Sequence, residues 1–381
     1  MKKIKIAFFT ENLYGGGVEK IQQVILKNFN YNKYDVTLYS NRKEELSRQY
    51  YPTFIKYKFI FSNTSKNVLE NFYGKINNKI KLWVYYHCSP NLFHLLFIRK
   101  KYDVAIAFIE GYATKFVSGM PKSVKKIAWV HTDMENNHWT NVAYKSLKEE
   151  NITYSKYHKI VCVSKIIKDK MNKLYNVTDK TIIITNPIEK DLIRDLSKNS
   201  LNYRDYPYKV RLITLGSLIE IKGYDRLLRI SKRLVEDNVN FELLILGKGK
   251  MKDLLLNYIK DNKLGNYITL VGFVENPYPY IAASDIYVCS SYAEGYNTAI
   301  TEALILGKPV VSTECSGVKE QLGENNEFGI CTPNTEEGLY EGIKQMLNET
   351  TLKHYTKMAK ERGENFTLEA SMNKIYHLLE S

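Results

Sequence analysis

The chain has 381 residues, and its 55 Lys and Arg outnumber its 41 Asp and Glu, which gives a formal net charge of +14. The excess lies in the first half, because residues 1–187 hold 31 basic and 14 acidic residues, whereas residues 188–381 hold 24 and 27. A hydrophobic content of 44% excludes a wholly disordered chain, the apolar runs are shorter than the ~20 residues that span a bilayer, and the length predicts two domains.

Apolar runs alternate with amphipathic stretches along the first half. Ile4–Thr10 is strand-like, and the N-terminal MKKIKIAFFTEN is typical of a first strand rather than a signal peptide. A glycine cluster follows at 15–17, and Val18–Phe29 then has apolar residues at helical spacing. The other strand-like runs are Tyr34–Ser40, Tyr102–Ile109, Lys126–Thr132, Lys159–Ser164 and Thr181–Pro187. Near-continuous β-branched runs suit parallel strands buried on both faces, and their alternation with helices predicts doubly wound α/β units.

The same pattern restarts in the second half, after a polar stretch, Glu189–Tyr208, that is expected to be a connector. Its strand-like runs are Val210–Ser217, Phe241–Gly247, Tyr267–Phe273, Ser284–Ser291 and Lys308–Thr313. The tail, Tyr355–Ser381, has a helical pattern and no strand. The sequence therefore predicts two successive Rossmann-like halves of about equal size.

The cysteines are odd in number and widely spaced: Cys88, Cys162, Cys289, Cys315 and Cys331. No CxxC motif or Cys/His cluster occurs among them. This spacing favours neither a disulfide framework nor a zinc site, and it indicates a soluble protein of a reducing compartment.

The junctions between strands and loops are the candidate sites, because ligands of open α/β sheets bind beyond the carboxyl ends of the strands. The first junction, Glu11–Lys20, contains the glycine cluster. Glycines there let backbone N–H groups approach a phosphate, and the helix that follows adds a favourable dipole. A tight turn into a helix explains the same residues, and without GxGxxG a dinucleotide site is not indicated.

Two junctions of the second half carry lysines. In Gly216–Leu228, Lys222 precedes a glycine at a helix start, which places an ammonium group beside a flexible backbone and suits a diphosphate. A surface lysine is the alternative. The run LGKGK, with Gly247 and Lys248, is another strand-end glycine turn and is less specific.

The junction Ser290–Leu304 holds two glutamates eight residues apart. Glu294 lies in the loop, and Glu302 lies within a helix expected to begin near Asn297. Two carboxylates suit a polyhydroxyl ligand, because each ionised oxygen accepts charge-assisted hydrogen bonds from hydroxyl groups. The alternative interpretation is that Glu294 is an ordinary loop residue and Glu302 a solvated helix residue, and that neither binds a ligand.

Taken together and in order, these motifs resemble family 4 of the retaining nucleotide-sugar glycosyltransferases. The motifs are GGVE, the histidine of WVHTD, GSxxxxKG, GKG, GFVENPYPYIAASDIYVCSSYAEGYNTAITEALILGKPVVST and SGVKE. The resemblance covers essentially the whole chain, and it is strongest from Val210 to Gly317 and most specific in the E-x7-E element. It implies the GT-B fold, an α/β fold of two Rossmann-like doubly wound domains facing a central cleft. Residues 1–187 would bind the acceptor, residues 188–365 would bind the nucleotide sugar, and residues 366–381 would form a helix packing back on the first domain.

The resemblance also implies roles for the matching residues. The catalytic residues would be His131 beside the anomeric centre, Lys222 on the diphosphate and Glu294 on the sugar hydroxyls. Glu302 would bind the ribose, and the loop from Phe273 to Asn276 would hold the base. The other donor-binding residues would be Gly16, Gly17, Ser217, Gly247, Lys248, Val274, Gly295, Tyr296, Asn297 and Thr298. Backbone groups at the glycine cluster and at residues 295–297 would approach the phosphates and the sugar.

The chain departs from the family pattern at one position, because many members carry Arg where this sequence has Ser217. Lys248 or a basic residue of the first domain would then complete the diphosphate site. No Asp-x-Asp element occurs; Asp133 and Glu135 are the nearest match and are expected to solvate a loop. We therefore expect no metal ion or other cofactor, with Lys222, backbone N–H groups and helix dipoles stabilising the leaving diphosphate.

The mechanism implied by the resemblance is front-face attack with retention of the anomeric configuration. The departing phosphate would take the proton of the acceptor, so that His131 would contribute position and electrostatics rather than act as a base. A core histidine at a strand end is the alternative reading of His131. Closure of the two domains would exclude water and limit hydrolysis of the donor.

The acceptor side has a basic and aromatic stretch between Lys66 and Lys101, with Glu70 as its single acid. Its basic residues are Lys66, Lys75, Lys79, Lys81, Arg99, Lys100 and Lys101, and its aromatic residues are Phe72, Tyr73, Trp83, Tyr85, Tyr86, Phe93 and Phe97. This composition suits the interface of an anionic membrane. A soluble basic face with aromatic side chains in the core is the alternative, and no nucleic-acid motif is present.

The sequence therefore predicts a retaining, metal-independent transferase that uses a nucleotide sugar, most simply a UDP-sugar. The acceptor would be a saccharide or a lipid-linked glycan of bacterial surface polysaccharide synthesis, and no nucleic acid is expected to bind. The enzyme would be cytoplasmic, at or near the inner face of the cell membrane. A non-catalytic partner or chaperone of another transferase is the second hypothesis, and an epimerase or hydrolase of the same fold is disfavoured by the E-x7-E element.

Overall fold

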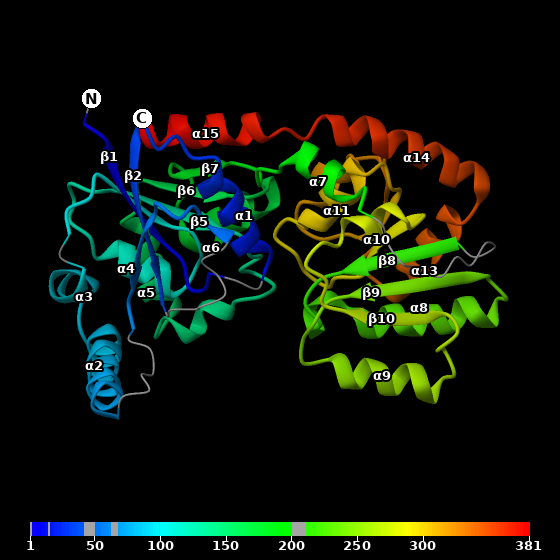
Figure 1. Cartoon of the computed structure of the whole chain (residues 1–381), viewed down its shortest axis with the longest axis horizontal. Helices are drawn as coiled ribbons and strands as arrows, with labels where there is room; N and C mark the ends of the chain where they lie inside the picture. Colours follow the sequence, from blue (N-terminus) through cyan, green and yellow to red (C-terminus); the bar gives the residue numbers. More distant parts are fainter. Residues whose placement is uncertain (1, 14–15, 42–49, 62–67, 99, 200–209) are drawn as a thin grey trace. The chain divides into compact units, whose positions relative to one another are not determined.

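The computed structural model describes residues 2–13, 16–41, 50–61, 68–98, 100–199 and 210–381 (Figure 1). The chain divides into two compact units, residues 1–187 with 369–381 (unit 1) and residues 188–368 (unit 2). Gly15 of the glycine cluster, Lys66 and Arg99 of the basic stretch, and residues 200–208 of the expected connector lie outside the described residues.

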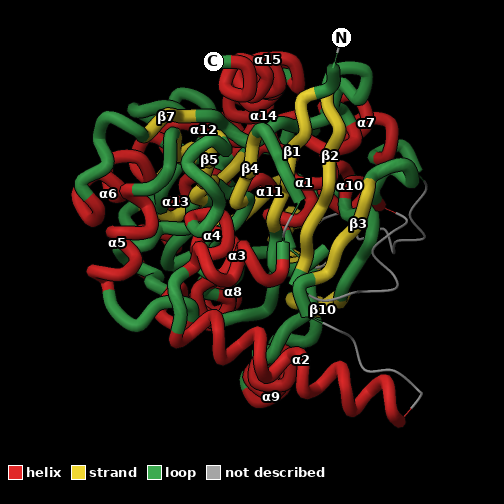
Figure 2. The backbone as a smooth tube through the Cα atoms, turned by 90° about the vertical axis from the view of Figure 1, so that its left-hand side faces the viewer, coloured by secondary structure: helices red, strands yellow, loops and turns green. Residues whose placement is uncertain are grey.

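Unit 1 is built on a parallel sheet, in which the described strands have the order β3-β2-β1-β4-β5-β6-β7. The strands are β1 (Ile4–Phe9), β2 (Tyr34–Ser40), β3 (Lys56–Phe59), β4 (Val104–Ala107), β5 (Lys125–Val130), β6 (Lys159–Cys162) and β7 (Thr181–Ile183). Figure 2 shows β3, β2, β1 and β4 side by side. The inner strands are buried almost throughout, as β-branched and aromatic runs covered on both faces should be.

The helices of unit 1 are α1 (Gly17–Lys27), α2 (Val68–His87), α3 (Pro90–Phe97), α4 (Tyr112–Ser118), α5 (Leu147–Ser155), α6 (Lys165–Tyr175) and α15 (Leu368–Glu380), with a 3₁₀ turn at Trp139–Val142. Three of them begin at a serine cap. Ser89, Ser146 and Ser164 each accept a hydrogen bond from the backbone N–H three residues on. Such caps satisfy an N–H group that a helix start leaves unpaired.

Unit 2 repeats the architecture, and its described strands have the order β10-β9-β8-β11-β12-β13. The strands are β8 (Val210–Leu215), β9 (Phe241–Leu246), β10 (Ile268–Gly272), β11 (Ile286–Cys289), β12 (Val310–Thr313) and β13 (Ile330–Thr332). The helices are α7 (Lys190–Leu196), α8 (Tyr224–Glu236), α9 (Lys252–Asp261), α10 (Tyr278–Ala282), α11 (Thr298–Ile305), α12 (Val318–Leu322), α13 (Glu336–Met346) and α14 (Glu349–Glu364), with a 3₁₀ turn at Glu220–Lys222. Two separate apolar clusters cover the two faces of this sheet.

Each sheet has one place where the direction of strand succession reverses. In unit 1 it lies between β1 and β4, and in unit 2 it lies between β8 and β11. At such a point the loops that follow the two strands turn to opposite faces of the sheet, and a crevice opens between them. The strand order therefore determines which loops can contact one ligand: those after β1 and β4 in unit 1, and those after β8 and β11 in unit 2.

The structure corrects some of the expected elements. The prediction of a connector over Glu189–Tyr208 is wrong for its first part, because residues 190–196 form α7. The strands β3 and β13, and the helices α2 and α3, were not anticipated. Nine of the eleven predicted strands also ran one to four residues too far at their carboxyl ends, in part because loop residues such as Phe108, Ile109 and Thr132 are still apolar or β-branched. None of the described helices is both long and apolar enough to cross a membrane.

The last helix, α15, is part of unit 1, as the fold prediction requires (Figure 1). The Tyr376 hydroxyl donates to the Asn28 carbonyl oxygen at 2.8 Å, and its ring stacks on Tyr34 with 5.9 Å between ring centres. Glu380 accepts from Lys33 and from the Tyr34 hydroxyl, both at 2.6 Å. The apolar side of the helix is buried, since Ile375 is only 1% exposed.

We expect Ile375→Ala to lower the free energy of unfolding by about 2–4 kcal/mol, because it removes buried methyl groups and leaves a cavity. Chemical denaturation followed by circular dichroism measures the loss. Lys374→Ala, an exposed change on the same helix, should shift the free energy by less than about 0.5 kcal/mol. Equal effects of the two substitutions would show that α15 is not packed on the rest of unit 1.

Candidate functional site

Topology gathers the predicted residues of unit 2 at the carboxyl ends of four neighbouring strands. Ser217 and Lys222 follow β8, Gly247 and Lys248 follow β9, Phe273 and Val274 follow β10, and residues 294–298 follow β11. Because all four strands are parallel, their loops emerge at the same edge of the sheet. The candidate site of unit 2 is therefore built from the sheet edge that the sequence indicated.

An ion pair spans the reversal point between β8 and β11. The Lys222 ammonium group lies 2.7 Å from Oε1 and 2.8 Å from Oε2 of Glu294. The two side chains are 25% and 9% exposed. Burial by itself lowers the pKa of Lys222, but the Glu294 carboxylate outweighs it and the pKa is raised, so the lysine stays charged.

The Glu294 carboxylate is held unevenly. Oε1 also accepts from the Ser291 hydroxyl at 2.6 Å and from the Asn297 amide at 3.3 Å, whereas within the described chain Oε2 accepts only from Lys222. An ammonium group has three N–H donors, and two of them point at this carboxylate. One N–H of Lys222 and one lone pair of Oε2 are thus left side by side for a ligand.

Helix α11 begins where the sequence predicts. Asn297 is its cap, and its side-chain oxygen accepts from Ala299 N at 3.0 Å. The Asn297 carbonyl oxygen also accepts from the side-chain amide of Gln321 at 2.8 Å, which ties the helix start to α12. Gly295 is buried, and Tyr296 and Thr298 are half-buried in the same turn.

The second glutamate of the pair is inside the protein. Glu302 is the fifth residue of α11 and is only 3% exposed, so its interpretation as a solvated helix residue is wrong. The Tyr278 hydroxyl donates to Glu302 Oε1 at 3.4 Å. A carboxylate this deeply buried is held by polar groups of the protein and not by bulk water.

A glycine lets the Lys222 loop approach the β11 loop. Gly223 has φ +64°, and a Cβ there would lie 2.0 Å from the Ser290 carbonyl oxygen. The Ser290 hydroxyl donates to the Lys222 carbonyl oxygen at 2.9 Å. Only glycine combines this left-handed conformation with this contact, so Gly223 sets the distance across which Lys222 meets Glu294.

A buried arginine, which the sequence analysis did not single out, holds the same loop. Arg226 is 2% exposed and donates to the Ser290 carbonyl oxygen at 2.7 Å and to Asn334 Oδ1 at 2.8 Å. It also donates to the Ser291 carbonyl oxygen and the Thr313 hydroxyl. Since its nitrogens are taken up by the protein, Arg226 positions the loop and does not replace the arginine that Ser217 lacks.

The loops after β8 and β9 touch through their backbones. A Cβ on Gly247 would lie 1.8 Å from the Gly216 carbonyl oxygen, and Gly247 N donates to the Gly272 carbonyl oxygen at 2.8 Å. The ammonium group of Lys248 lies 4.6 Å from the centre of the Phe273 ring, which is 49% exposed. Ser217 is exposed beside them, so a cation and an aromatic face border this end of the site.

The candidate residue of unit 1, His131, follows β5 and is held by a glutamate that the sequence analysis did not name. Glu110 follows β4, is fully buried, and its Oε1 accepts from the backbone N–H groups of His131 and Thr132 at 2.5 and 2.7 Å. The imidazole packs edge-on against Phe108, with 4.8 Å between ring centres. Within the described residues, Glu110 Oε2 and His131 Nε2 are buried without a hydrogen-bond partner.

The imidazole of His131 is neutral near pH 7. Burial lowers its pKa to about 3, against a smaller opposing effect of a hydrogen bond with the Phe108 backbone. A group with this pKa is a poor general base at neutral pH, which agrees with the positional role implied by the resemblance. Buried polar atoms without partners are rare in proteins, so Nε2 and the Glu110 oxygen mark a place where a ligand or water would be bound.

A further carboxylate, that of Glu11, lies at the reversal point of unit 1. Glu11 follows β1, and its Oε1 accepts from Tyr112 N, which follows β4, at 3.4 Å. Burial raises the pKa of Glu11 to about 7; the Tyr112 hydrogen bond opposes this, and the charges of Glu110 and Glu19 add to it. Gly16 caps α1 and Gly17 is its first residue, so the glycine cluster does lead into a helix start.

The pair Asp133 and Glu135 was expected to solvate a loop, and for Asp133 this is wrong. Asp133 is 3% exposed and accepts from Lys170 at 2.5 Å, whereas Glu135 pairs with Lys173 at the surface. No group of three or more His, Cys, Asp or Glu in the described part of the chain could hold a metal ion. The five cysteines are free.

Comparison with protein families gives one match. Residues 203–365 match the model of the glycosyl transferases group 1. An uncharacterized glycosyltransferase of Methanocaldococcus jannaschii is 31% identical over 229 residues, which are 58% of this chain and 56% of that protein. The N-acetylgalactosamine-N,N'-diacetylbacillosaminyl-diphospho-undecaprenol 4-alpha-N-acetylgalactosaminyltransferase of Campylobacter jejuni is 35% identical over 158 residues, 41% of this chain and 42% of that protein. The chain thus spans about half the length of these relatives.

Solved structures match over nearly the whole chain. Anabaena HepE in complex with UDP and glucose has a TM-score of 0.76 and 17% identity, with 99% of each chain covered. A mutant of S. aureus TarM in complex with Fondaparinux, alpha-GlcNAc-glycerol and UDP has a TM-score of 0.72 and 14% identity, with 99% of this chain and 100% of that chain covered. These matches confirm the GT-B fold that the sequence predicts.

We expect Gly223→Ala to lower the free energy of unfolding by more than about 2 kcal/mol, since it adds both a strained left-handed residue and a clash with Ser290. The matched control is Gly265→Ala, where a Cβ would meet nothing within 4 Å. Urea denaturation of the two variants measures the difference. Equal stability would show that the two loops are not held at the distance described.

The raised pKa of Glu11 predicts a pH dependence of stability. Between the unfolded value of about 4.5 and the folded value of about 7, the folded state binds more protons, so stability falls as the pH rises through this window. Relative to Glu11→Gln, the wild type should lose about 1–3 kcal/mol between pH 4.5 and 7.5. Parallel stability curves would show that Glu11 is ionised throughout.

Proposed function

We propose that the protein is a retaining glycosyltransferase that moves a sugar from a UDP-sugar to a saccharide or lipid-linked acceptor, since residues 203–365 match the model of the group 1 glycosyl transferases and the chain has the GT-B fold. The reaction needs no metal ion in this proposal. It takes place in the cytoplasm, at the inner face of the cell membrane, during synthesis of a bacterial surface polysaccharide or glycoconjugate.

The names of similar proteins support the donor and the acceptor class. The Anabaena structure holds UDP and glucose, which supports a UDP-sugar donor. The Campylobacter relative is named for a diphospho-undecaprenol acceptor, and a Rhizobium meliloti relative for lipopolysaccharide core biosynthesis. These names support a lipid-linked acceptor, and in this proposal the basic half of the chain contacts the anionic membrane that holds it.

The observation that carries the proposal is that Lys222 and Glu294 each keep hydrogen-bonding capacity that no described residue uses. One N–H of Lys222 is unused, and it lies next to Glu294 Oε2, which accepts only from Lys222 among the described residues. A donor diphosphate would bind the N–H, and a hydroxyl of the transferred sugar would bind Oε2. The ion pair holds both groups in position before the donor arrives, which is how electrostatic stabilisation of a leaving group acts.

The departing diphosphate is stabilised by groups of unit 2. As the bond to the anomeric carbon breaks, negative charge grows on the phosphate, and Lys222 and the N-terminus of α11 favour it. The acceptor hydroxyl attacks the same face of the sugar and gives its proton to the departing phosphate. Retention then requires no protein nucleophile, and the roles of Gly16, Gly17 and the neutral His131 stay predictions of the resemblance.

A second candidate function rests on Ser217. A protein without the usual arginine on the diphosphate could bind a nucleotide poorly and serve as a non-catalytic partner of another transferase. Lys248, beside Phe273 at the same edge, is a cation that could take over the role. Calorimetry with UDP separates the two functions, because a folded protein that binds no UDP at millimolar concentration would support the second.

We expect Lys222→Met and Glu294→Gln each to lower kcat/KM for transfer at least about a hundredfold, because each removes a group that acts on the departing or transferred moiety. Activity is measured as UDP release and glycoside product with a UDP-sugar and a lipid-linked acceptor. The control is Lys250→Met, whose lysine is 70% exposed and pairs only with Glu220 among the described residues. Full activity of either site variant, with its circular dichroism unchanged, would refute the site.

A further inference from the structure

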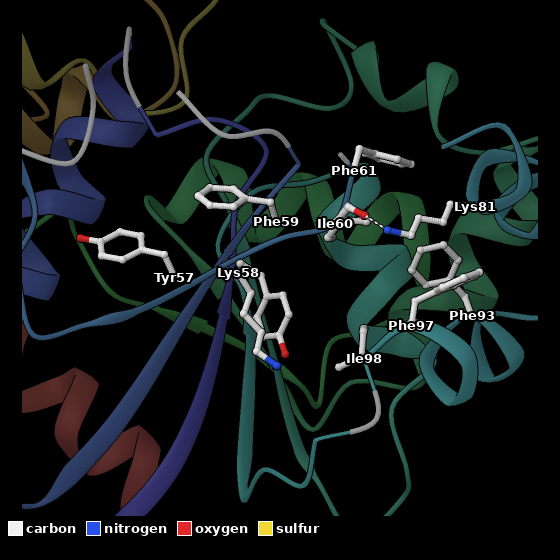
Figure 3. A pocket seen from close by; sticks show the side chains of 10 residues that line it. Tyr57, Lys58, Phe59, Ile60, Phe61, Lys81, Phe93, Phe97 and Ile98 are labelled. Carbon is white, nitrogen blue, oxygen red and sulfur yellow. Dashed lines mark hydrogen bonds between the residues drawn. The ribbon is translucent and has the colours of Figure 1, made fainter. Parts of the chain in front are cut away.

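A cavity of about 410 Å³ lies in unit 1 between β3 and the helices α2 and α3 (Figure 3). Its lining residues are Tyr39, Tyr57, Lys58, Phe59, Ile60, Phe61, Lys81, Phe93, Phe97 and Ile98. Eight of these ten are aromatic or aliphatic, and the other two are lysines. The volume is within the range of small-molecule sites, and the lining suits a ligand that is mostly apolar.

The two lysines give the cavity a positive charge. The Lys81 ammonium group donates to the Ile60 carbonyl oxygen at 2.5 Å and lies 5.7 Å from the centre of the Phe97 ring (Figure 3). Lys58 lies 5.9 Å from the Tyr39 ring. Neither lysine has an ion-pair partner in the part of the chain that the structure describes. Lys81 is half-buried and Lys58 is exposed, and a half-buried cation without an anion favours a ligand that brings one.

The outer face of α2 carries an apolar stripe that no described residue covers. Phe72, Ile76, Ile80 and Trp83 are spaced by four, four and three residues, which places them on one face of the helix. Their exposed fractions are 59%, 40%, 51% and 58%. An amphipathic helix normally turns such a stripe toward the core, so this one indicates a surface that meets something else.

The neighbouring helix and two lysines extend this surface. Leu92, Leu95 and Leu96 of α3 are 38%, 65% and 37% exposed. Lys75 and Lys79 are exposed on α2 beside the stripe and have no ion-pair partner among the described residues. Exposed Trp and Leu side chains flanked by lysines are typical of helices that lie in the interface of an anionic membrane.

We propose that the cavity binds the phosphate and apolar chain of an anionic lipid, and that the outer faces of α2 and α3 seat on the membrane leaflet that contains it. The same two helices form both surfaces: Lys81, Phe93 and Phe97 line the cavity, and the stripe lies on the outside. An apolar hollow with two lysines in its lining matches one chain with an anionic head, whereas a protein partner would need no such hollow. Identifying this lipid as the acceptor rests on the function proposed above.

The position of the cavity suits an acceptor. It lies where β2 and β3 end, on the same edge of the sheet as Glu110 and His131, which follow β4 and β5. Three strand spacings separate β2 from β5, which is about 14 Å. A lipid phosphate held at Lys81 would thus leave room for its saccharide to extend toward His131.

Calorimetric titration of the full chain with farnesyl phosphate, a short isoprenyl phosphate, tests the cavity. We expect saturable binding that Lys81→Met and Phe97→Asn each weaken at least tenfold, because the Phe97 ring lies beside Lys81 in the cavity, whereas Lys122→Met, an exposed lysine elsewhere in unit 1, leaves it unchanged. Farnesol and inorganic phosphate, each containing half of the ligand, should bind at least tenfold more weakly. Absence of farnesyl phosphate binding, equal binding by all variants, or equal binding of inorganic phosphate would overturn the assignment.

UDP titrated into the same samples separates this inference from the proposed function. Binding of UDP without binding of farnesyl phosphate would refute the lipid site and leave the transferase function standing. Binding of farnesyl phosphate without UDP would refute the transferase function and leave the lipid site standing. Retained UDP binding also shows that each variant is folded.

Flotation with vesicles tests the outer surface. We expect the chain to bind vesicles containing phosphatidylglycerol at least tenfold more tightly than pure phosphatidylcholine vesicles, and Ile80→Asn with Trp83→Ala to abolish this preference. Leu254→Asn, which changes a 56% exposed leucine of unit 2, is the control and should bind like the wild type. Unchanged vesicle binding of the stripe variant, or a loss of self-association in its place, would show that the stripe does not face a membrane.

Discussion

The ion pair between Lys222 and Glu294 depends on the order of the strands in unit 2. Succession reverses between β8 and β11, so the loops after these strands part around a crevice, and each loop supplies one charge to it. Taking two charges partly out of water costs free energy, and additional hydrogen bonds to the charged groups offset that cost. Ser291 and Asn297 satisfy Glu294 Oε1, and the groups left over are the ones that a ligand can use.

The crevice keeps its width because the backbone is fixed beneath it. Gly223 allows the β8 loop to touch the Ser290 carbonyl oxygen, and Arg226 gathers the carbonyl oxygens of Ser290 and Ser291 from inside the protein. Unit 1 uses the same principle with other chemistry, since Glu110 binds the two backbone N–H groups that begin the loop after β5. In both units a buried polar side chain holds a loop so that a neighbouring group can face a ligand.

Local sequence patterns predicted the buried strands, the helix start at Asn297 and the glutamate pair, because each depends on neighbours in the chain. They did not predict β3, whose residues alternate between exposed and half-buried at the sheet edge. Arg226 was missed because it looks like a surface residue of an amphipathic helix until its partners, 64 to 108 residues away, are known. Glu110 could have been found, since a carboxylate directly after a buried strand stands where ligands bind.

The net charge of the chain is +14, and the structure shows that its lysines fall into two groups. Lys170 neutralises the buried Asp133, and Lys33 and Lys125 fasten α15 to unit 1, so these charges serve the fold. The lysines of α2 and of the cavity have no ion-pair partner among the described residues, although Lys81 donates to the Ile60 carbonyl oxygen, and those of α2 lie beside exposed apolar side chains. Composition counts both groups alike. Only the pairing separates charge that stabilises the protein from charge available to a ligand. That second group lies on unit 1, the half that the proposed function assigns to the acceptor.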